Sequence, residues 1–185
     1  YGDLKGDLQV QTNWTDGNNS IETMAEAARA AGLEYIVITD HTKRLAMTGG
    51  LDEKRIVQQM REIEKINVKF QSSNDKFRIL KGTECDILKD GRLDLPDEIL
   101  GQLDVVGASV HSYFNLPRAE QTERIISAMR NPHVDIIFHP TGRKINQRPA
   151  YDLDMDAIIN AARETGTVLE IDAFPDRLDL NDEYI

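Results

Sequence analysis

Short apolar runs alternate with amphipathic stretches along most of the chain. The apolar runs lie near residues 6–11, 35–39, 78–88, 105–110, 135–138 and 168–171. Between several of them, apolar residues recur every three or four positions, at 21–31, 51–67, 117–130 and 155–165. This spacing is typical of helices that bury one face, whereas short continuous apolar runs are typical of buried strands. The pattern therefore predicts an α/β fold with a largely parallel sheet.

Two segments depart from this alternation. The turn pair Asp90-Gly91 separates the apolar run 78–88 from residues 92–95, and this arrangement predicts a β-hairpin. The polar residues 71–75 predict a surface linker after the second helix.

Local signals also predict the ends of the first helix. Asn19 and Ser20 are suited to cap its first turn, and Glu22 stands three residues after Asn19, as in a capping box. Gly32 follows the last residue with helical spacing, where a glycine commonly ends a helix.

Most of the apolar runs end in side chains that can bind a metal ion or move a proton. These residues are Asp16 in the loop after the first run, then His41, Glu84, His111 and His139. The carboxyl ends of parallel strands in a βα barrel meet at one face, which is where such barrels carry out chemistry. Two histidines and a carboxylate suit a divalent cation that keeps open positions for water and substrate.

We therefore predict one metal site at Glu84, His111 and His139, and a second at Asp16 and His41. Such ions lower the pKa of bound water and neutralise charge on a phosphoryl group. Glu84, His41 and Asp16 are accordingly the candidate catalytic residues.

The first strand carries amides where a metal site would favour imidazoles. Gln9 and Gln11 stand two residues apart, so their side chains point to the same side of the strand. A neutral amide is a poor metal ligand beside imidazole or carboxylate. We expect this strand to contribute weakly to metal binding.

Composition narrows the classes of function. The chain has 185 residues, of which 40% are hydrophobic, and this suits a single domain over residues 1–185 with a substantial core. No apolar run approaches the roughly 20 residues of a membrane span, so we expect a cytoplasmic protein that does not enter membranes. The single cysteine, Cys85, is expected to be a buried thiol. The net charge of −10 argues against a surface that binds nucleic acid by bulk electrostatics.

Basic residues nevertheless follow the candidate histidines. Lys43 and Arg44 come directly after His41, Arg118 follows His111, and Arg143 follows His139. If the histidines share a face, these four basic side chains surround it and would bind a phosphate. The alternative is that they are ordinary solvated loop charges.

At these residues the sequence resembles the PHP (polymerase and histidinol phosphatase) family, and specifically the C-terminal PHP domain of bacterial and archaeal family X DNA polymerases. The matching stretches run in order along nearly the whole chain: Gly6-Asp7-Leu8 to Asp16-Gly17, Thr39-Asp40-His41, Leu45 to Glu53, Ile79 to Glu84, Asp94-Leu95-Pro96, Ala108 to Ser112, Asn115 to Arg118, His139 to Arg143 and Phe174 to Asp182.

The resemblance implies an irregular βα barrel that holds up to three Mn²⁺ or Zn²⁺ ions and hydrolyses phosphoesters, as a 3′-5′ exonuclease in these polymerases. It implies that Glu84 bridges two ions, with His111 and His139 completing one site and Asp16 and His41 belonging to another. It also implies DNA and an attached polymerase domain as partners.

Two departures from the family pattern change this expectation. The family carries His-x-His where this chain has Gln9 and Gln11, and the family's closing Asp-x-His motif would lie beyond Ile185. We therefore expect a piece of a longer polymerase chain, with a barrel truncated at its C-terminal end, one or two bound ions and weakened hydrolysis. The alternatives are a non-catalytic module that supports the polymerase and a phosphomonoesterase of the histidinol phosphatase type.

Overall fold

The computed structural model describes residues 3–72 and 76–185, and its contacts divide the chain into two compact units. The first unit comprises Tyr1–Glu84 with Leu95–Val105, and the second comprises Cys85–Asp94 with Val106–Ile185. Each unit contains strands joined by helices, as the sequence pattern predicts.

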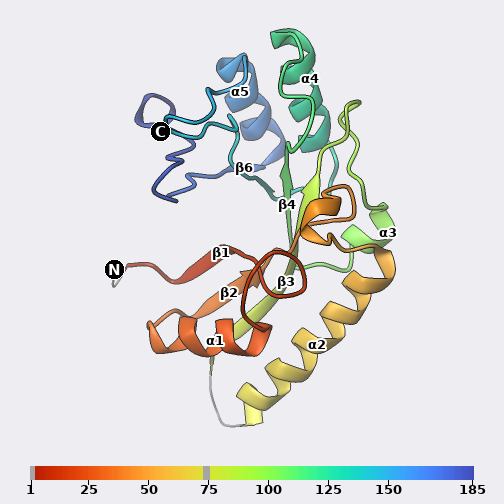
Figure 1. The fold of residues 1–185 in the computed structure, drawn as a ribbon, viewed down its shortest axis with the longest axis vertical. Coiled ribbons are helices and arrows are strands. Elements are labelled where there is room, and N and C mark those ends of the chain that lie inside the picture. The colour runs from red at the N-terminus through yellow and green to blue at the C-terminus, as the bar shows by residue number, and fades with distance from the viewer. Residues whose placement is uncertain (1–2, 73–75) are drawn as a thin grey trace. The chain divides into compact units, whose positions relative to one another are not determined.

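The first unit is built on three parallel strands in chain order (Figure 1). Its elements are β1 (Gly6–Val10), α1 (Ile21–Ala30), β2 (Tyr35–Ile38), α2 (Glu53–Ser72), β3 (Arg78–Asp86) and the short α3 (Asp97–Leu100). A 3₁₀ turn at Ala46–Thr48 interrupts the loop between β2 and α2. The last two residues of β3 belong to the second unit, so this strand passes from one unit into the other.

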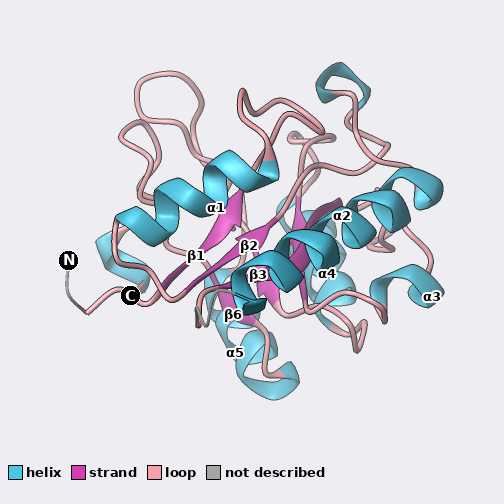
Figure 2. Ribbon diagram, turned by 90° about the horizontal axis from the view of Figure 1, so that it is seen from below, coloured by secondary structure: helices cyan, strands magenta, loops and turns pink. Residues whose placement is uncertain are grey.

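Helices α1 and α2 lie on the same face of strands β1 to β3 (Figure 2). The core between them contains Ile21 and Ala25 of α1 together with Ile63, Ile66 and Phe70 of α2. Burial of these side chains stabilises the unit, because removal of apolar area from water is the dominant favourable term in folding.

Helix α2 is longer than its apolar spacing suggested. It continues past residue 67 to Ser72, because Phe70 is buried and packs edge-on against Phe77, with ring centroids 5.6 Å apart. The predicted linker at 71–75 is therefore wrong for its first two residues, which are helical, and its other three lie outside the described residues.

The second unit also has parallel strands in chain order. Its elements are β4 (Val105–Ser109), α4 (Arg118–Met129), β5 (Ile136–Ile137), α5 (Met155–Thr165) and β6 (Val168–Leu169). Helices α4 and α5 pack side by side, as Figure 1 shows. Strands β5 and β6 are only two residues long, so much of this unit is held by loops and helices rather than by a long strand ladder.

The predicted hairpin forms its turn but not its second strand. Leu88 N–H donates to the Arg92 carbonyl at 2.7 Å, and a single antiparallel bridge joins Ile87 to Leu93. Pairing stops there because Asp94 uses its side chain instead: its Oδ1 accepts from Asp86 N–H at 3.2 Å and from the buried Cys85 thiol at 3.1 Å.

Ser20 caps α1, as predicted, and accepts a hydrogen bond from Thr23 N–H at 3.2 Å. The capping-box role of Glu22 is wrong. Its carboxylate instead pairs with Lys69 of α2 at 2.8 Å, because α1 and α2 lie on the same face of the sheet. Across the part of the chain that the structure describes, no helix has the length and apolar character that a bilayer crossing requires.

A buried carboxylate joins three segments of the first unit. Asp40, the second residue after β2, has no exposed surface. It accepts from Thr12 N–H at 2.8 Å, from Thr12 Oγ1 at 2.6 Å and from Gln59 Nε2 of α2 at 2.7 Å, and Thr15 also donates to it. Hydrogen bonds to an ionised group are about twice as strong as neutral ones. Asp40 therefore fixes the loop after β1 against β2 and α2.

We expect Asp40→Asn to lower the free energy of unfolding by about 2–3 kcal/mol, because it removes the charge and points an amide N–H₂ at existing donors. Urea denaturation followed by circular dichroism measures this. Asp90→Asn makes the same chemical change on the exposed turn and should leave the midpoint unchanged. Equal midpoints for the two variants would contradict the role given to Asp40.

Candidate metal centre

Three predicted residues come together in the first unit. His41 follows β2, Glu84 lies near the end of β3, and their backbones form a parallel bridge. Asp16 belongs to the loop after β1. His41 Nε2 lies 3.6 Å from Asp16 Oδ2, and His41 Nδ1 lies 3.6 Å from Glu84 Oε2. The imidazole ring therefore lies between two carboxylates.

The three side chains of this cluster differ in their exposure to solvent. The Glu84 side chain is 2% exposed, that of His41 is 11% exposed and that of Asp16 is 46% exposed. A small ligand would therefore meet Asp16 first and Glu84 last. Burial also strengthens the attraction between these carboxylates and a positive charge, because charge interactions are far less screened in the interior than in water.

Gln9 of β1 and Gln11, which directly follows this strand, point at the same carboxylate. Gln9 Nε2 donates to Glu84 Oε2 at 3.2 Å, and Gln11 Nε2 donates to the same atom at 3.0 Å. The prediction that the two side chains share one side of the strand is confirmed. Their amides are used as hydrogen-bond donors, and this partly satisfies a buried negative charge that would otherwise be costly.

Two more predicted residues come together in the second unit. The rings of His111 and His139 meet edge to face, with centroids 5.3 Å apart and planes at 66°. Asp86 lies beside the first of them: its Oδ1 accepts from His111 N–H at 3.2 Å and lies 3.4 Å from His111 Nδ1. Asp86 is 1% exposed, so this carboxylate is buried against the histidine.

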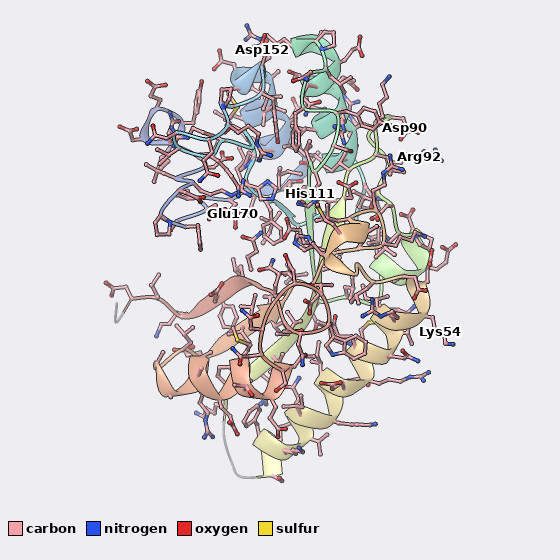
Figure 3. All side chains as sticks on the ribbon, viewed as in Figure 1. Lys54, Asp90, Arg92, His111, Asp152 and Glu170 are labelled. Atoms are coloured by element: carbon pink, nitrogen blue, oxygen red, sulfur yellow. The ribbon has the colours of Figure 1, made fainter. Side chains whose placement is uncertain are left out.

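The backbone at His139 is held in an unusual conformation. Its φ of 33° is in the left-handed region that favours glycine. Glu170 stabilises it, since its Oε2 accepts from His139 N–H at 2.6 Å. Figure 3 labels Glu170 and His111 in this unit. Strained backbone is concentrated at functional sites, where the surroundings hold it in place.

Sequence reasoning did not select Glu170 or Arg124 as important residues. Arg124 of α4 is 1% exposed, and its guanidinium donates to the carbonyls of Leu88 at 2.8 Å, Ser112 at 2.7 Å and Ile87. The sequence does contain a signal, because Arg124 stands next to Ile125 on the apolar face of a helix. Its planar set of donors is suited to several acceptors at once.

Predicted phosphate-binding residues also contact other protein groups. Lys43 pairs with Glu53, and Arg118 Nη2 lies 3.6 Å from Asp154 Oδ2. Arg143 Nη2 donates to the carbonyls of Leu178 and Arg177, the latter at 3.1 Å. Phosphate binding by these residues and by Arg44 stays a prediction.

The donor atoms of both clusters suit transition-metal ions. Imidazole nitrogens with carboxylate oxygens are typical ligands of Mn²⁺ and Zn²⁺, and each unit offers both kinds. In the first unit His41, Glu84 and Asp16 provide them, and in the second His111 and His139 do so beside Asp86. The residues present therefore fit a divalent cation.

Comparison with known proteins gives the chain its family. Residues 7–144 match the family described as PHP domain, and this stretch includes residues of both units. The chain belongs to the PHP family. The predicted family resemblance is thereby confirmed over residues 7–144, whereas the metal-binding roles of the five candidate ligands stay a prediction.

Two curated relatives show which PHP proteins are similar. Over 184 residues the chain is 47% identical to the DNA polymerase/3′-5′ exonuclease PolX of Bacillus subtilis, a match that covers 100% of the chain and 32% of that protein. Over 171 residues it is 34% identical to a probable phosphatase of Caldanaerobacter subterraneus subsp. tengcongensis, covering 89% of the chain and 61% of that protein. The PHP chain thus spans about a third of the length of the polymerase that it resembles.

A solved structure supports the fold. The putative histidinol phosphatase hisK from Listeria monocytogenes superposes with a TM-score of 0.70 at 14% identity, covering 95% of the chain and 85% of that protein. At this identity the likeness establishes the fold alone. The α/β, PHP-type fold predicted from the sequence is confirmed.

We expect Arg124→Met in the PHP chain to lower the free energy of unfolding by about 3 kcal/mol or more. The substitution keeps an apolar stem but leaves three carbonyls, that of Ile87 buried and the others partly buried, without this donor. Thermal and urea denaturation would measure the change. Arg130→Met, at the exposed end of the same helix, is the matched control and should have little effect. A small effect of Arg124→Met would mean that water satisfies those carbonyls.

Proposed function

We propose that this PHP chain is a metal-dependent phosphoesterase that hydrolyses phosphodiester bonds at the 3′ end of DNA. The observation that supports this best is the position of His41 between the Asp16 and Glu84 carboxylates, 3.6 Å from each. Nitrogen and oxygen donors held this close, with one carboxylate buried, are the arrangement that a divalent cation needs.

The choice of DNA over a small phosphomonoester rests on similarity. The chain is 47% identical to a protein named as a polymerase and 3′-5′ exonuclease, and 34% identical to one named as a probable phosphatase. The first match extends over the whole chain. A DNA substrate and an attached polymerase domain are therefore part of the proposal.

Each residue has a proposed role. Glu84, His111 and His139 would hold one cation, and Asp16 with His41 would hold another, following the order of the family motifs. Bound there, a cation supplies positive charge to the phosphoryl oxygens and activates water for attack. His41 is suited to orient or move a proton, because its two ring nitrogens face two carboxylates. Lys43, Arg44, Arg118 and Arg143 would position the DNA phosphates.

The test is release of nucleotides from a 3′-labelled single strand in the presence of Mn²⁺, using the longest natural form of the protein that contains this chain. We expect Glu84→Gln to reduce the rate by about 100-fold or more, because it removes the charge at the centre of the donor set. Glu98→Gln changes an exposed carboxylate of α3 in the same way and should keep the full rate. Equal rates for the two variants, or no Mn²⁺-dependent release by the unchanged protein, would overturn the proposal.

The hydrogen bonds of the glutamines favour a second candidate, a non-catalytic module that supports an attached polymerase. Gln9 and Gln11 both donate to Glu84 Oε2, so this carboxylate has partners without any cation. A barrel stabilised in this way could be retained for its structure alone.

Metal content distinguishes the two candidates. We expect the unchanged chain, purified without chelator, to hold one or two ions by elemental analysis, and Gln9→His/Gln11→His to hold about one more, because imidazole replaces a poor ligand. A gain of metal together with a gain of hydrolysis means that the natural chain is a weakened enzyme. If the unchanged chain holds no metal and the double variant gains none, the metal-dependent proposal fails and the structural role remains.

A further inference from the structure

The second unit contains a hollow that the metal centre does not use. Its volume is about 590 Å³, and residues 113–116 and 148–151 line it. This volume lies within the roughly 300–1,000 Å³ of typical small-ligand sites. Both lining segments belong to the second unit, so the hollow is a feature of that unit by itself.

Flat groups form much of the wall. The rings of Phe114 and Tyr151 are stacked, with centroids 6.2 Å apart and planes within 18° of parallel. The guanidinium carbon of Arg148 lies 4.3 Å from the centroid of Phe114. Tyr151 is buried and Phe114 is half-buried, so an aromatic face and a planar cation border the same space. A ligand that suits this wall is flat, aromatic and attached to a negative charge.

Two more cationic side chains lie near the ring of Tyr113, at the edge of the hollow. Tyr113 is 46% exposed as a residue, and Lys89 Nζ and the guanidinium carbon of Arg124 each lie 5.8 Å from the centroid of its ring. Its φ of 56° is left-handed. The conformation is held in place, because Arg124 donates to the carbonyl of the preceding Ser112 at 2.7 Å. The exposed ring is thus a fixed feature of the loop.

Hydrogen bonds connect the hollow to the segment of His139. Arg148 Nε donates to the Gly142 carbonyl at 2.8 Å, and Gly142 N–H donates to the His139 carbonyl at 2.9 Å. On the other wall, Tyr113 follows His111 by two residues. Each wall of the hollow therefore continues directly into one of the two paired histidines.

We propose that this hollow binds the base of a terminal nucleotide of single-stranded DNA, which stacks on Phe114 while Arg148 and Lys89 attract its phosphates. Base stacking on aromatic side chains does not depend on sequence, because every base has a flat π face, and positive groups along the strand provide the rest of the affinity. The net charge of the chain is −10, so these cations are a local attraction on an acidic protein. The inference names the ligand of the proposed hydrolase and so rests on that function.

The test measures binding of a fluorescent single-stranded oligonucleotide by anisotropy in EDTA, so that neither metal nor hydrolysis contributes. We expect Phe114→Ala to weaken binding about tenfold, the loss of one stacked base. Phe114→Leu keeps apolar volume without a π face and should lose nearly as much. Phe174→Ala, at a 67% exposed phenylalanine outside the hollow, should bind as the unchanged protein does. Thermal denaturation checks that each variant is folded.

An oligonucleotide with an abasic 3′-terminal residue separates the base from the phosphates. The unchanged protein should bind it about tenfold more weakly than the intact strand, and Phe114→Leu should bind both strands equally. Equal affinity of the unchanged protein for the two strands, or no effect of either Phe114 substitution, overturns the inference. If the protein hydrolyses DNA but its binding does not depend on the terminal base, only this inference fails. If its binding depends on the base but it hydrolyses no DNA, only the proposed function fails.

Discussion

Burial of carboxylates beside strands and loops is the constraint on which both units depend. Asp40, Glu84, Asp86 and Asp179 are each at most 2% exposed. A buried charge is tolerated only when it is hydrogen-bonded or paired, so each carboxylate must recruit donors from another part of the chain. Asp179 does so by accepting from Thr141 N–H at 3.0 Å and from Thr141 Oγ1 at 2.8 Å. The polar groups that could carry out chemistry are therefore also the groups that fix the loops around them.

Glu84 shows how this constraint allows a site to change. At the two positions where the sequence resemblance predicts imidazoles, this chain has amides, and both donate to one oxygen of the carboxylate. A site whose carboxylate is satisfied by protein donors can fold without an ion, whereas many metal sites couple folding to metal binding. Gln9 and Gln11 thus stabilise the buried carboxylate of the first unit with protein donors alone.

Sequence reasoning succeeded where one local signal determined the outcome. Strand and helix order followed from apolar spacing, and the pairing of His111 with His139 followed from their places after successive strands. It failed where a contact with a distant segment determined the local structure. Helix α2 extends to Ser72 because Phe70 packs against Phe77, and Glu22 pairs with Lys69 of α2 rather than capping its own helix. Arg124 and Glu170 were missed because their partners are backbone groups, which leave no trace in the identity of neighbouring residues.

The route of the chain between its units has a consequence for its synthesis. Strand β3 leaves the first unit at Glu84, residues 85–94 belong to the second unit, and residues 95–105 return to the first. Neither unit is a continuous piece of sequence, so no single proteolytic cut separates them cleanly: a cut after Val105 leaves residues 85–94 of the second unit attached to the first. On the ribosome the first unit cannot be completed until Val105 has emerged, by which time part of the second is already outside. We therefore expect the two units to fold together rather than one after the other.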